Sequence, residues 1–379
     1  PNEAGRAGRV LFTVFAGRRR FLSILLTYVR MYLELGVLDE VHIWDYCRQE
    51  ADRHYVKSLA AEAVRGIKVL TPPAWDLEAP ARSHHKWKGY YAHYASMLSD
   101  ADLLIKCDDD VVFIANLPKL LAYVRADGGR HQMYYPSIVN NDVAAAYQAA
   151  DGVITDPEYV LSVQASQGLS PISDWYNCTA CAQHVHTLFL REPAAFFTGC
   201  VHEWTVAARV SINFFVMTGM TARRTFGELV ADTRLSIDGD SVVDEAYLTT
   251  LVTERTRKPS VMLSDTVVAH FSFSSQHLES PRELRDAYLK LSRYHSKLRE
   301  LETQFASRPL RMECASSAPA SLQQSRRTLR PASRRRGGTG RGVGRGNATR
   351  AVSAVSRRAA AFGPSWAREP GSLGSRQLL

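Results

Sequence analysis

Three consecutive aspartates, Asp108, Asp109 and Asp110, interrupt an otherwise apolar stretch, ADLLIKCDDDVVFIANLPKLL, at residues 101–121. Carboxylates packed this closely repel one another, and burial without partners is costly, so the cluster needs either a compensating cation or exposure to water. The apolar flanks place the triplet at the end of a buried strand rather than on a solvated face. A divalent metal or substrate site is therefore favoured, and a structural acidic turn remains the alternative.

The residues before the triplet alternate between strand and helix patterns. Apolar runs at 9–18, 40–47 and 67–73 are typical of strands, and the segments between them show helical spacing, as does a segment at about 84–98. This alternation predicts an α/β fold with a mostly parallel, doubly wound sheet. Ligands bind beyond the carboxyl ends of strands in such sheets, where the triplet and Asp45 are expected to lie.

The pattern changes beyond residue 135. The sequence there is irregular and rich in turn residues, which predicts loops and short helices. Residues 264–275 return to strand character. Residues 280–305 are predicted to form a final helix, with Ser280 as its cap and Pro281 at its first position.

The basic charge is concentrated near the end of the chain. The net charge is +9, but residues 308–379 hold fifteen Arg and two Glu, a charge of +13, which leaves −4 for residues 1–307. The Arg-, Gly- and Ser-rich tail is poor in core-forming residues, so we expect it to be disordered. It can contact anionic surfaces, but with only Phe362 and Trp366 as aromatics, no dedicated nucleic-acid partner is expected.

In this context the triplet resembles the DxD motif of nucleotide-sugar glycosyltransferases with the GT-A fold, which is Rossmann-like. The local similarity is to Fringe and β1,3-galactosyltransferase-type enzymes, across KWKGYYAHYASMLSDADLLIKCDDDVVFIANLPKLLAYV. The resemblance implies a divalent cation, Mn²⁺ or Mg²⁺, that bridges the diphosphate of a UDP- or GDP-sugar and neutralises the leaving group. Asp110 would be the main metal ligand, and Asp108 would bind the metal or its water and reach the ribose. Asp109 and Asp45 would lie near the donor.

Lys86 occupies the position of a lysine that lies near the donor nucleotide in this family. A surface lysine is the alternative, with Lys88 as the nearby substitute.

Two later motifs extend the resemblance. Asp244 and Glu245, in SVVDEAYLTTL, resemble the acidic pair of inverting GT-A enzymes, in which one carboxylate takes the proton of the attacking hydroxyl. The family's base aligns with Glu245, where many relatives have Asp, so the choice within the pair stays open, as does a plain helix start. His270, in VVAHFSF, resembles the histidine that completes the metal shell, with a structural histidine as the alternative.

The resemblance predicts a GT-A domain at 1–307, with a nucleotide-sugar-binding half (1–135), an acceptor-side half (136–279) and a final helix (280–307). Its implied activity is metal-dependent transfer of a hexose to a hydroxyl of a glycan or glycoprotein, with inversion or retention left open. One alternative is a nucleotidyltransferase, although FAGRRRFL is a poor phosphate loop. The other is a catalytically inert glycan- or RNA-binding protein on a GT-A-like scaffold.

The six cysteines are too few for a disulfide scaffold. Cys107 is predicted to be a small core residue. The remaining signal is a cluster that could hold structural zinc, unless its CxxC pair forms a disulfide or stays free. Its members are Cys178, Cys181, His184, His186, Cys200 and His202.

The compartment depends on what precedes the given chain. No apolar run approaches the roughly 18 to 20 residues of a membrane span. The chain begins with Pro1 rather than Met. We therefore expect the lumen of the Golgi or endoplasmic reticulum if an amino-terminal anchor has been lost, and the cytoplasm otherwise.

Overall fold

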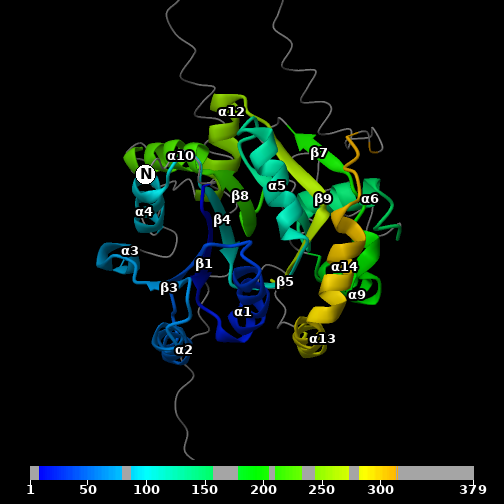
Figure 1. Ribbon diagram of the computed structural model, residues 1–379, viewed down its shortest axis with the longest axis horizontal. Helices are drawn as coiled ribbons and strands as arrows, with labels where there is room; N and C mark the ends of the chain where they lie inside the picture. The colour runs from blue at the N-terminus through cyan, green and yellow to red at the C-terminus, as the bar shows by residue number, and fades with distance from the viewer. Residues whose placement is uncertain are drawn as a thin grey trace, which may run out of the picture.

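A computed structural model of the protein describes residues 8–78, 87–156, 178–204, 210–232, 244–272, 281–312 and 314. It has an α/β fold in which helices flank one nine-stranded sheet, with strand order β3-β2-β1-β4-β8-β6-β9-β5 and with β7 paired to β9 (Figure 1). The strands are β1 (Val10–Ala16), β2 (Glu40–Asp45), β3 (Ile67–Leu70), β4 (Leu103–Asp108), β5 (Val111–Ala115), β6 (Tyr134–Val139), β7 (Val201–Trp204), β8 (Phe214–Thr218) and β9 (Ser260–His270).

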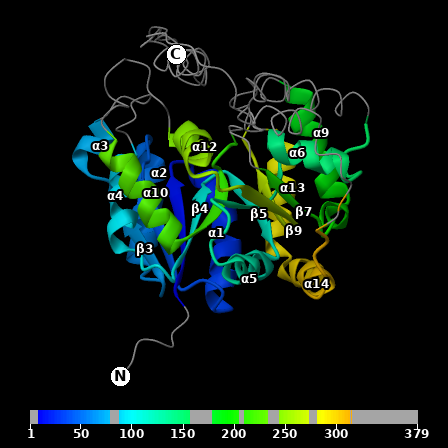
Figure 2. The same ribbon diagram turned by 90° about the horizontal axis from the view of Figure 1, so that it is seen from above.

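The helices cover both faces of the sheet. They are α1 (Arg19–Glu34), α2 (Glu50–Ala61), α3 (Ala74–Glu78), α4 (Lys88–Met97), α5 (Leu117–Asp127), α6 (Asp142–Ala150), α9 (Thr179–Arg191), η2 (Pro193–Phe196), α10 (Gly219–Ala231), α11 (Asp244–Ala246), η4 (Tyr247–Leu251), α12 (Val252–Thr256), α13 (Arg282–Arg293) and α14 (His295–Ala306). In both views α4 packs beside α10, on the side away from α6 and α9 (Figures 1 and 2). Among the described residues, no helix has the length and apolar character needed to cross a membrane.

The first half of the sheet is parallel, as the alternating pattern predicts. β1 pairs in parallel with β2 and β4, and β2 pairs in parallel with β3. Phe15 lies opposite Asp108 and Ala16 lies opposite Asp45. The carboxyl ends of β1, β2 and β4 therefore meet at one edge of the sheet.

The prediction of a mostly parallel sheet is wrong for the other half, which makes the whole sheet mixed. β8 runs antiparallel to β4 and β6, and β9 runs antiparallel to β5 and β7, while only β6 and β9 pair in parallel. Only Asp109 and Asp110 separate β4 from β5, and a parallel return needs a connection of a dozen or more residues. β5 therefore leaves β4 and pairs with β9 at the far edge.

The prediction of loops and short helices beyond residue 135 also misses regular structure. β6 is buried along its whole length in the interior of the sheet, and α9 runs for 13 residues. A strand buried on both faces has no alternating pattern, so a short apolar segment such as YYPSIV gives little signal among turn residues.

The end of the described chain differs from the prediction in two ways. The expected single helix is two, α13 and α14, because Tyr294 leaves the helical region (φ −96°, ψ 64°), and Pro281 caps α13 while Ser280 lies outside the described residues. Disorder from residue 308 is wrong for residues 308–312 and 314. Arg311 N–H donates to Gly199 O at 2.8 Å, and a disulfide joins Cys314 to Cys200. Residues 315–379 lie outside the described part.

Asp102 fastens the starts of β1 and β4 together. Its Oδ1 accepts the Arg9 backbone N–H at 2.9 Å, and its Oδ2 accepts Arg9 Nη2 at 2.8 Å and the Ser99 N–H at 2.9 Å. Burial alone would raise the pKa of Asp102, but the Arg9 hydrogen bond outweighs burial and lowers it. This carboxylate thus stabilises the sheet edge opposite the triplet.

We expect Asp102→Ala to lower the free energy of unfolding by about 2 kcal/mol or more, because three N–H donors lose their acceptor. Asp100→Ala is the matched control, since Asp100 is exposed and should contribute less than about 0.5 kcal/mol. The folded-state pKa of Asp102 lies below its ordinary value. Its stabilisation is therefore complete above that value and is lost as the pH falls toward the folded-state value. Urea unfolding in acid should show a steeper loss for the wild type than for Asp102→Asn, and equal slopes would contradict this account.

Candidate metal centre

The triplet lies at the carboxyl end of β4, where the sequence places it. Asp108 is the last residue of β4, and Asp109 and Asp110 form the turn into β5. The side chain of Asp108 is 32% exposed, whereas those of Asp109 and Asp110 are each 3% exposed. Two of the three carboxylates are thus buried and one reaches solvent.

Asp109 binds the turn between β1 and α1. Its Oδ2 accepts the backbone N–H groups of Gly17 and Arg18 at 2.7 and 2.6 Å, and its Oδ1 accepts Arg18 Nε and Nη2 at 2.9 and 2.6 Å. Burial raises the pKa of Asp109 to about 6, because the opposing effect of Arg18 is offset in part by the charge of Asp110. The carboxylate is ionised at neutral pH, as four N–H donors require. Donor binding by Asp109 stays a prediction, and the structure gives this residue a structural role.

Strand pairing brings His270 beside Asp110. Val111 lies opposite His270 in the β5–β9 register, and the Phe271 N–H donates to Asp110 O at 2.8 Å. His270 Nε2 then lies 3.2 Å from Asp110 Oδ1. Burial alone would lower the pKa of His270, but Asp110 outweighs it and raises it. Burial alone would raise the pKa of Asp110, but Arg18 and His270 lower it.

Asp108, Asp110 and His270 can together offer three ligand atoms to a metal ion. One such atom from each residue lies within 4.8 Å of the others. Asp110 Oδ1 is buried and makes no hydrogen bond of good geometry within the described part of the chain. Carboxylate oxygens with one imidazole nitrogen form a donor set suited to a divalent cation such as Mn²⁺.

Two basic side chains already compensate part of the negative charge. Arg18 Nη1 pairs with Asp110 Oδ2 at 2.9 Å, and Lys106 Nζ pairs with Asp108 and donates to Ile212 O at 2.7 Å. The demand for a cation that the sequence raises is therefore met in part by the protein itself. Neither residue was singled out from the sequence, although the basic run GRRR after the first strand and the lysine before the triplet were visible signals.

Asn213 is a further residue that sequence reasoning missed. Its backbone carbonyl accepts the Asp108 N–H at 2.8 Å, and its side chain is buried. Neither side-chain polar atom has a hydrogen-bond partner within the described ranges. A buried amide with unused donors and acceptors beside Asp108 is typical of a site that receives a ligand.

The acidic pair is divided between two surroundings. Asp244 Oδ2 accepts the Tyr91 hydroxyl at 2.6 Å, and burial raises the pKa of Asp244, with Tyr91 and Lys106 acting in the opposite direction. Asp108 is close enough for its charge to raise that pKa further. Glu245 instead acts on Tyr135, whose pKa is raised chiefly by burial. Asp244 therefore lies near the metal-ligating group.

The other predicted donor-binding residues lie apart from this group. Asp45 Oδ1 accepts the Cys47 N–H at 3.1 Å, and β1 separates Asp45 from Asp108, a distance of about 10 Å across two strand spacings. Lys86 lies outside the described residues. Its substitute Lys88 is buried and donates to Val230 O at 3.3 Å, and burial lowers the pKa of Lys88.

The zinc hypothesis for the CxxC pair is wrong, because Cys178 and Cys181 form a disulfide. Cys200 is joined to Cys314. Cys107 is a free, buried core residue as predicted, and Cys47 is also free and buried. The pattern of cysteines left these alternatives open, since pairing depends on distances that spacing does not give.

Neither a model of a known protein family nor a curated protein sequence matches the chain. The function is therefore argued from the geometry of the site alone.

We expect Arg18→Met to lower the free energy of unfolding by about 3 kcal/mol, because Asp109 and Asp110 would be left buried without their common cation. The figure is at the lower end for a buried ion pair, since the Arg18 side chain is 41% exposed. Arg20→Met, which removes an exposed guanidinium that lies over the Phe21 ring, should cost less than about 1 kcal/mol. Chemical denaturation of both variants measures the difference, and equal stabilities would show that Arg18 does not hold the triplet.

Proposed function

We propose that the protein is a metal-dependent glycosyltransferase that moves a hexose from a UDP- or GDP-sugar to a hydroxyl of a glycan or glycoprotein. The observation that carries the proposal is the meeting of Asp108, Asp110 and His270 at the carboxyl ends of parallel strands. The two halves of the motif are 160 residues apart in the sequence, and only the β5–β9 pairing joins them. The resemblance to GT-A enzymes with a DxD motif and a late histidine supplies the reaction class.

A divalent cation fits the residues at this site. Asp110 Oδ1 and His270 Nε2 would hold it from the buried side and Asp108 from the exposed side, and Mn²⁺ or Mg²⁺ both accept carboxylate oxygens. When bound, the cation supplies a positive charge that neutralises the diphosphate leaving group. Arg18 keeps Asp109 and Asp110 ionised and in place, so the ligand atoms are preorganised for binding.

Asp244 is the better candidate for the base within the acidic pair. A carboxylate accepts a proton from an attacking hydroxyl more readily when partial burial raises its pKa, and burial has that effect on Asp244. The Tyr91 hydroxyl, 2.6 Å from Oδ2, orients the carboxylate. Direct attack by a hydroxyl with Asp244 as base would invert the configuration of the sugar.

The first test is a screen of UDP- and GDP-sugar hydrolysis by the full chain with Mn²⁺ and with EDTA. We expect turnover of one donor that EDTA abolishes, and a loss of at least about 100-fold in Asp110→Asn and in His270→Ala, because each removes a ligand of the ion that offsets leaving-group charge. Asp100→Asn, an exposed carboxylate at the other edge of the sheet, should retain full activity.

Turnover that survives EDTA and both substitutions would contradict the metal role of these residues. Mn²⁺-dependent release of pyrophosphate from a nucleoside triphosphate, without sugar transfer, would instead support a nucleotidyltransferase. No turnover together with no Mn²⁺-dependent nucleotide binding would mean that the triplet is structural.

A second prediction concerns the base. Asp244→Asn should lower kcat/KM for the preferred donor by about 10²- to 10⁴-fold, the usual contribution of a general base. Tyr91→Phe removes a hydrogen bond that favours the ionised carboxylate. It should therefore move the acid limb of the pH profile of kcat/KM to higher pH as well as lower the rate.

Glu254→Gln, which changes an exposed carboxylate on α12, is the matched control and should leave rate and profile unchanged. A Tyr91→Phe enzyme that is slower but has an unmoved acid limb would assign Tyr91 to structure only. Full activity of Asp244→Asn together with a large loss in Glu245→Gln would assign the base to Glu245.

A further inference from the structure

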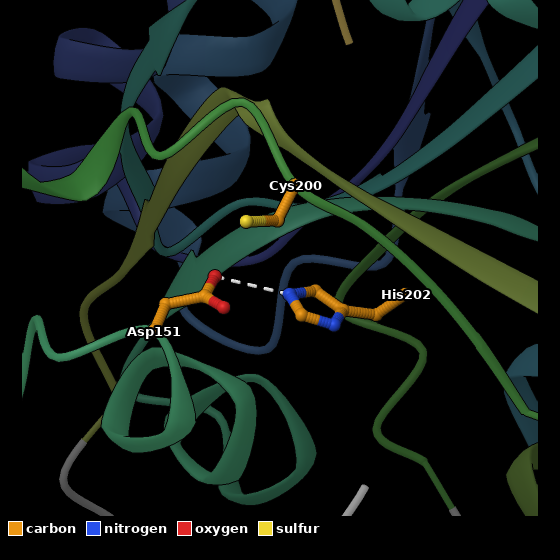
Figure 3. Close-up of side chains that lie close together, drawn as sticks. All are labelled: Asp151, Cys200 and His202. Atoms are coloured by element: carbon orange, nitrogen blue, oxygen red, sulfur yellow. Dashed lines mark hydrogen bonds and ion pairs between the residues drawn. The ribbon is translucent and has the colours of Figure 1, made fainter. Parts of the chain in front are cut away.

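A second group of metal-ligating side chains lies away from the candidate metal centre. Asp151 follows α6, Cys200 precedes β7, and His202 belongs to β7. One ligand atom from each lies within 4.8 Å of the others. Figure 3 shows the three side chains converging on one point, with His202 Nε2 3.0 Å from Asp151 Oδ2.

This group and the candidate metal centre occupy different positions along β9. β7 meets β9 with Val201 opposite Leu263, and His270 ends the same strand. The β6 register places Leu263 opposite Pro136 and Ala269 opposite Val139, three strand residues further along, which is about 10 Å. The two groups share no residue.

Asp151 has one acceptor atom to spare. Its Oδ2 receives the Thr198 hydroxyl at 2.9 Å and faces His202, but Oδ1 is buried and has no hydrogen-bond partner within the described ranges. The side chain of Asp151 is 4% exposed. A buried carboxylate oxygen without a partner is costly, and a cation bound there would remove that cost.

The imidazole is already held in one orientation. The Tyr147 ring stacks on the His202 ring with centroids 4.3 Å apart, and the His202 side chain is 8% exposed. Fixed orientation by neighbouring groups is what metal-binding imidazoles require. Two of the three ligands are thus preorganised.

Cys200 is occupied by its disulfide with Cys314. Metals bind cysteine as the thiolate, so the group lacks its sulfur ligand while the disulfide is intact. Cys200 is buried, whereas Cys314 is half-buried at the end of the described chain. The sulfur of Cys314 is therefore the one that a reductant reaches.

A dithiol reductant can release the ligand in two exchange steps. Its thiolate attacks Cys314 Sγ, the disulfide bond breaks, and Cys200 leaves as the thiolate. The second thiol of the reductant then displaces Cys314, which takes up a proton, and the reductant leaves as its own disulfide. Arg311 Nη2, 3.6 Å from Cys200 Sγ, favours the thiolate that remains.

We propose that Asp151, Cys200 and His202 form a zinc site that the Cys200–Cys314 disulfide closes and that reduction by a dithiol opens. Thiolate, imidazole and carboxylate together suit Zn²⁺, a borderline-soft ion that accepts all three ligand types, and water completes four-coordination. The disulfide also anchors residues 311–314 beside Gly199. Opening the site therefore releases the covalent hold on the chain end.

The test uses Cys314→Ser in the full chain, purified without reductant, so that Cys200 is a free thiol and the Cys178–Cys181 disulfide stays intact. Co²⁺, which takes the same ligands as Zn²⁺, is the probe because a thiolate ligand gives a sulfur-to-cobalt absorption band. We expect one Co²⁺ per chain with this band, displaced by Zn²⁺. The oxidised wild type and Cys200→Ser/Cys314→Ser should lack the band.

Asp151→Asn and His202→Gln, each made in the Cys314→Ser chain, should weaken Co²⁺ binding at least about tenfold. Asp110→Asn in the same chain should leave the band unchanged, because the candidate metal centre contains no sulfur. No thiolate band in Cys314→Ser that is folded by circular dichroism would overturn the proposal. So would a band that survives in both the Asp151 and His202 variants.

A second measurement covers the case in which Cys314→Ser does not fold. Cys178→Ser/Cys181→Ser keeps the Cys200–Cys314 disulfide and removes the other one. Treatment with a dithiol should create the Co²⁺ thiolate band in this variant, and removal of the dithiol with reoxidation should abolish it. Reduction of the disulfide without appearance of the band would contradict the redox control.

Discussion

Three adjacent carboxylates at the end of one strand can be packed into a protein only if positive charge lies beside them. Arg18 supplies it to Asp109 and Asp110, and Lys106 supplies it to Asp108. Asp109 also accepts the backbone N–H groups of Gly17 and Arg18 and so joins the end of β4 to the turn after β1. The arrangement keeps Asp110 ionised while one of its oxygens makes no hydrogen bond of good geometry.

The ligand geometry follows from the strand topology. The two-residue turn after Asp108 sends β5 away from β4 and into pairing with β9, and that register delivers His270 to Asp110. A shift of one residue between β5 and β9 would turn His270 to the opposite face of the sheet. Asn140 supports the strand end through its amide, which donates to Ser272 O at 2.9 Å and to His270 O at 3.3 Å.

The sequence predicts the first half of the fold and the principal members of the site, because both leave local patterns. Strand and helix periodicity identified β1 to β4, and the charges in an apolar run identified Asp108 to Asp110. The antiparallel half could not be predicted, since strand partners such as β5 and β9 are set by long-range packing. For the same reason, the pairing of Cys200 with Cys314 and the role of Arg18 depend on contacts across 114 and about 90 residues of chain.

The central claim is that a divalent cation binds between Asp110 and His270, and crystals of the full chain soaked in Mn²⁺ test it most directly. The account predicts an anomalous-scattering peak at the manganese edge, within bonding distance of Asp110 Oδ1, His270 Nε2 and an oxygen of Asp108, about 2.0 to 2.3 Å. An ordered site with no peak, in which Arg18 remains paired with Asp110 and His270 with Asp110 Oδ1, would contradict it. The triplet would then be a structural turn whose charge Arg18 and Lys106 balance by themselves.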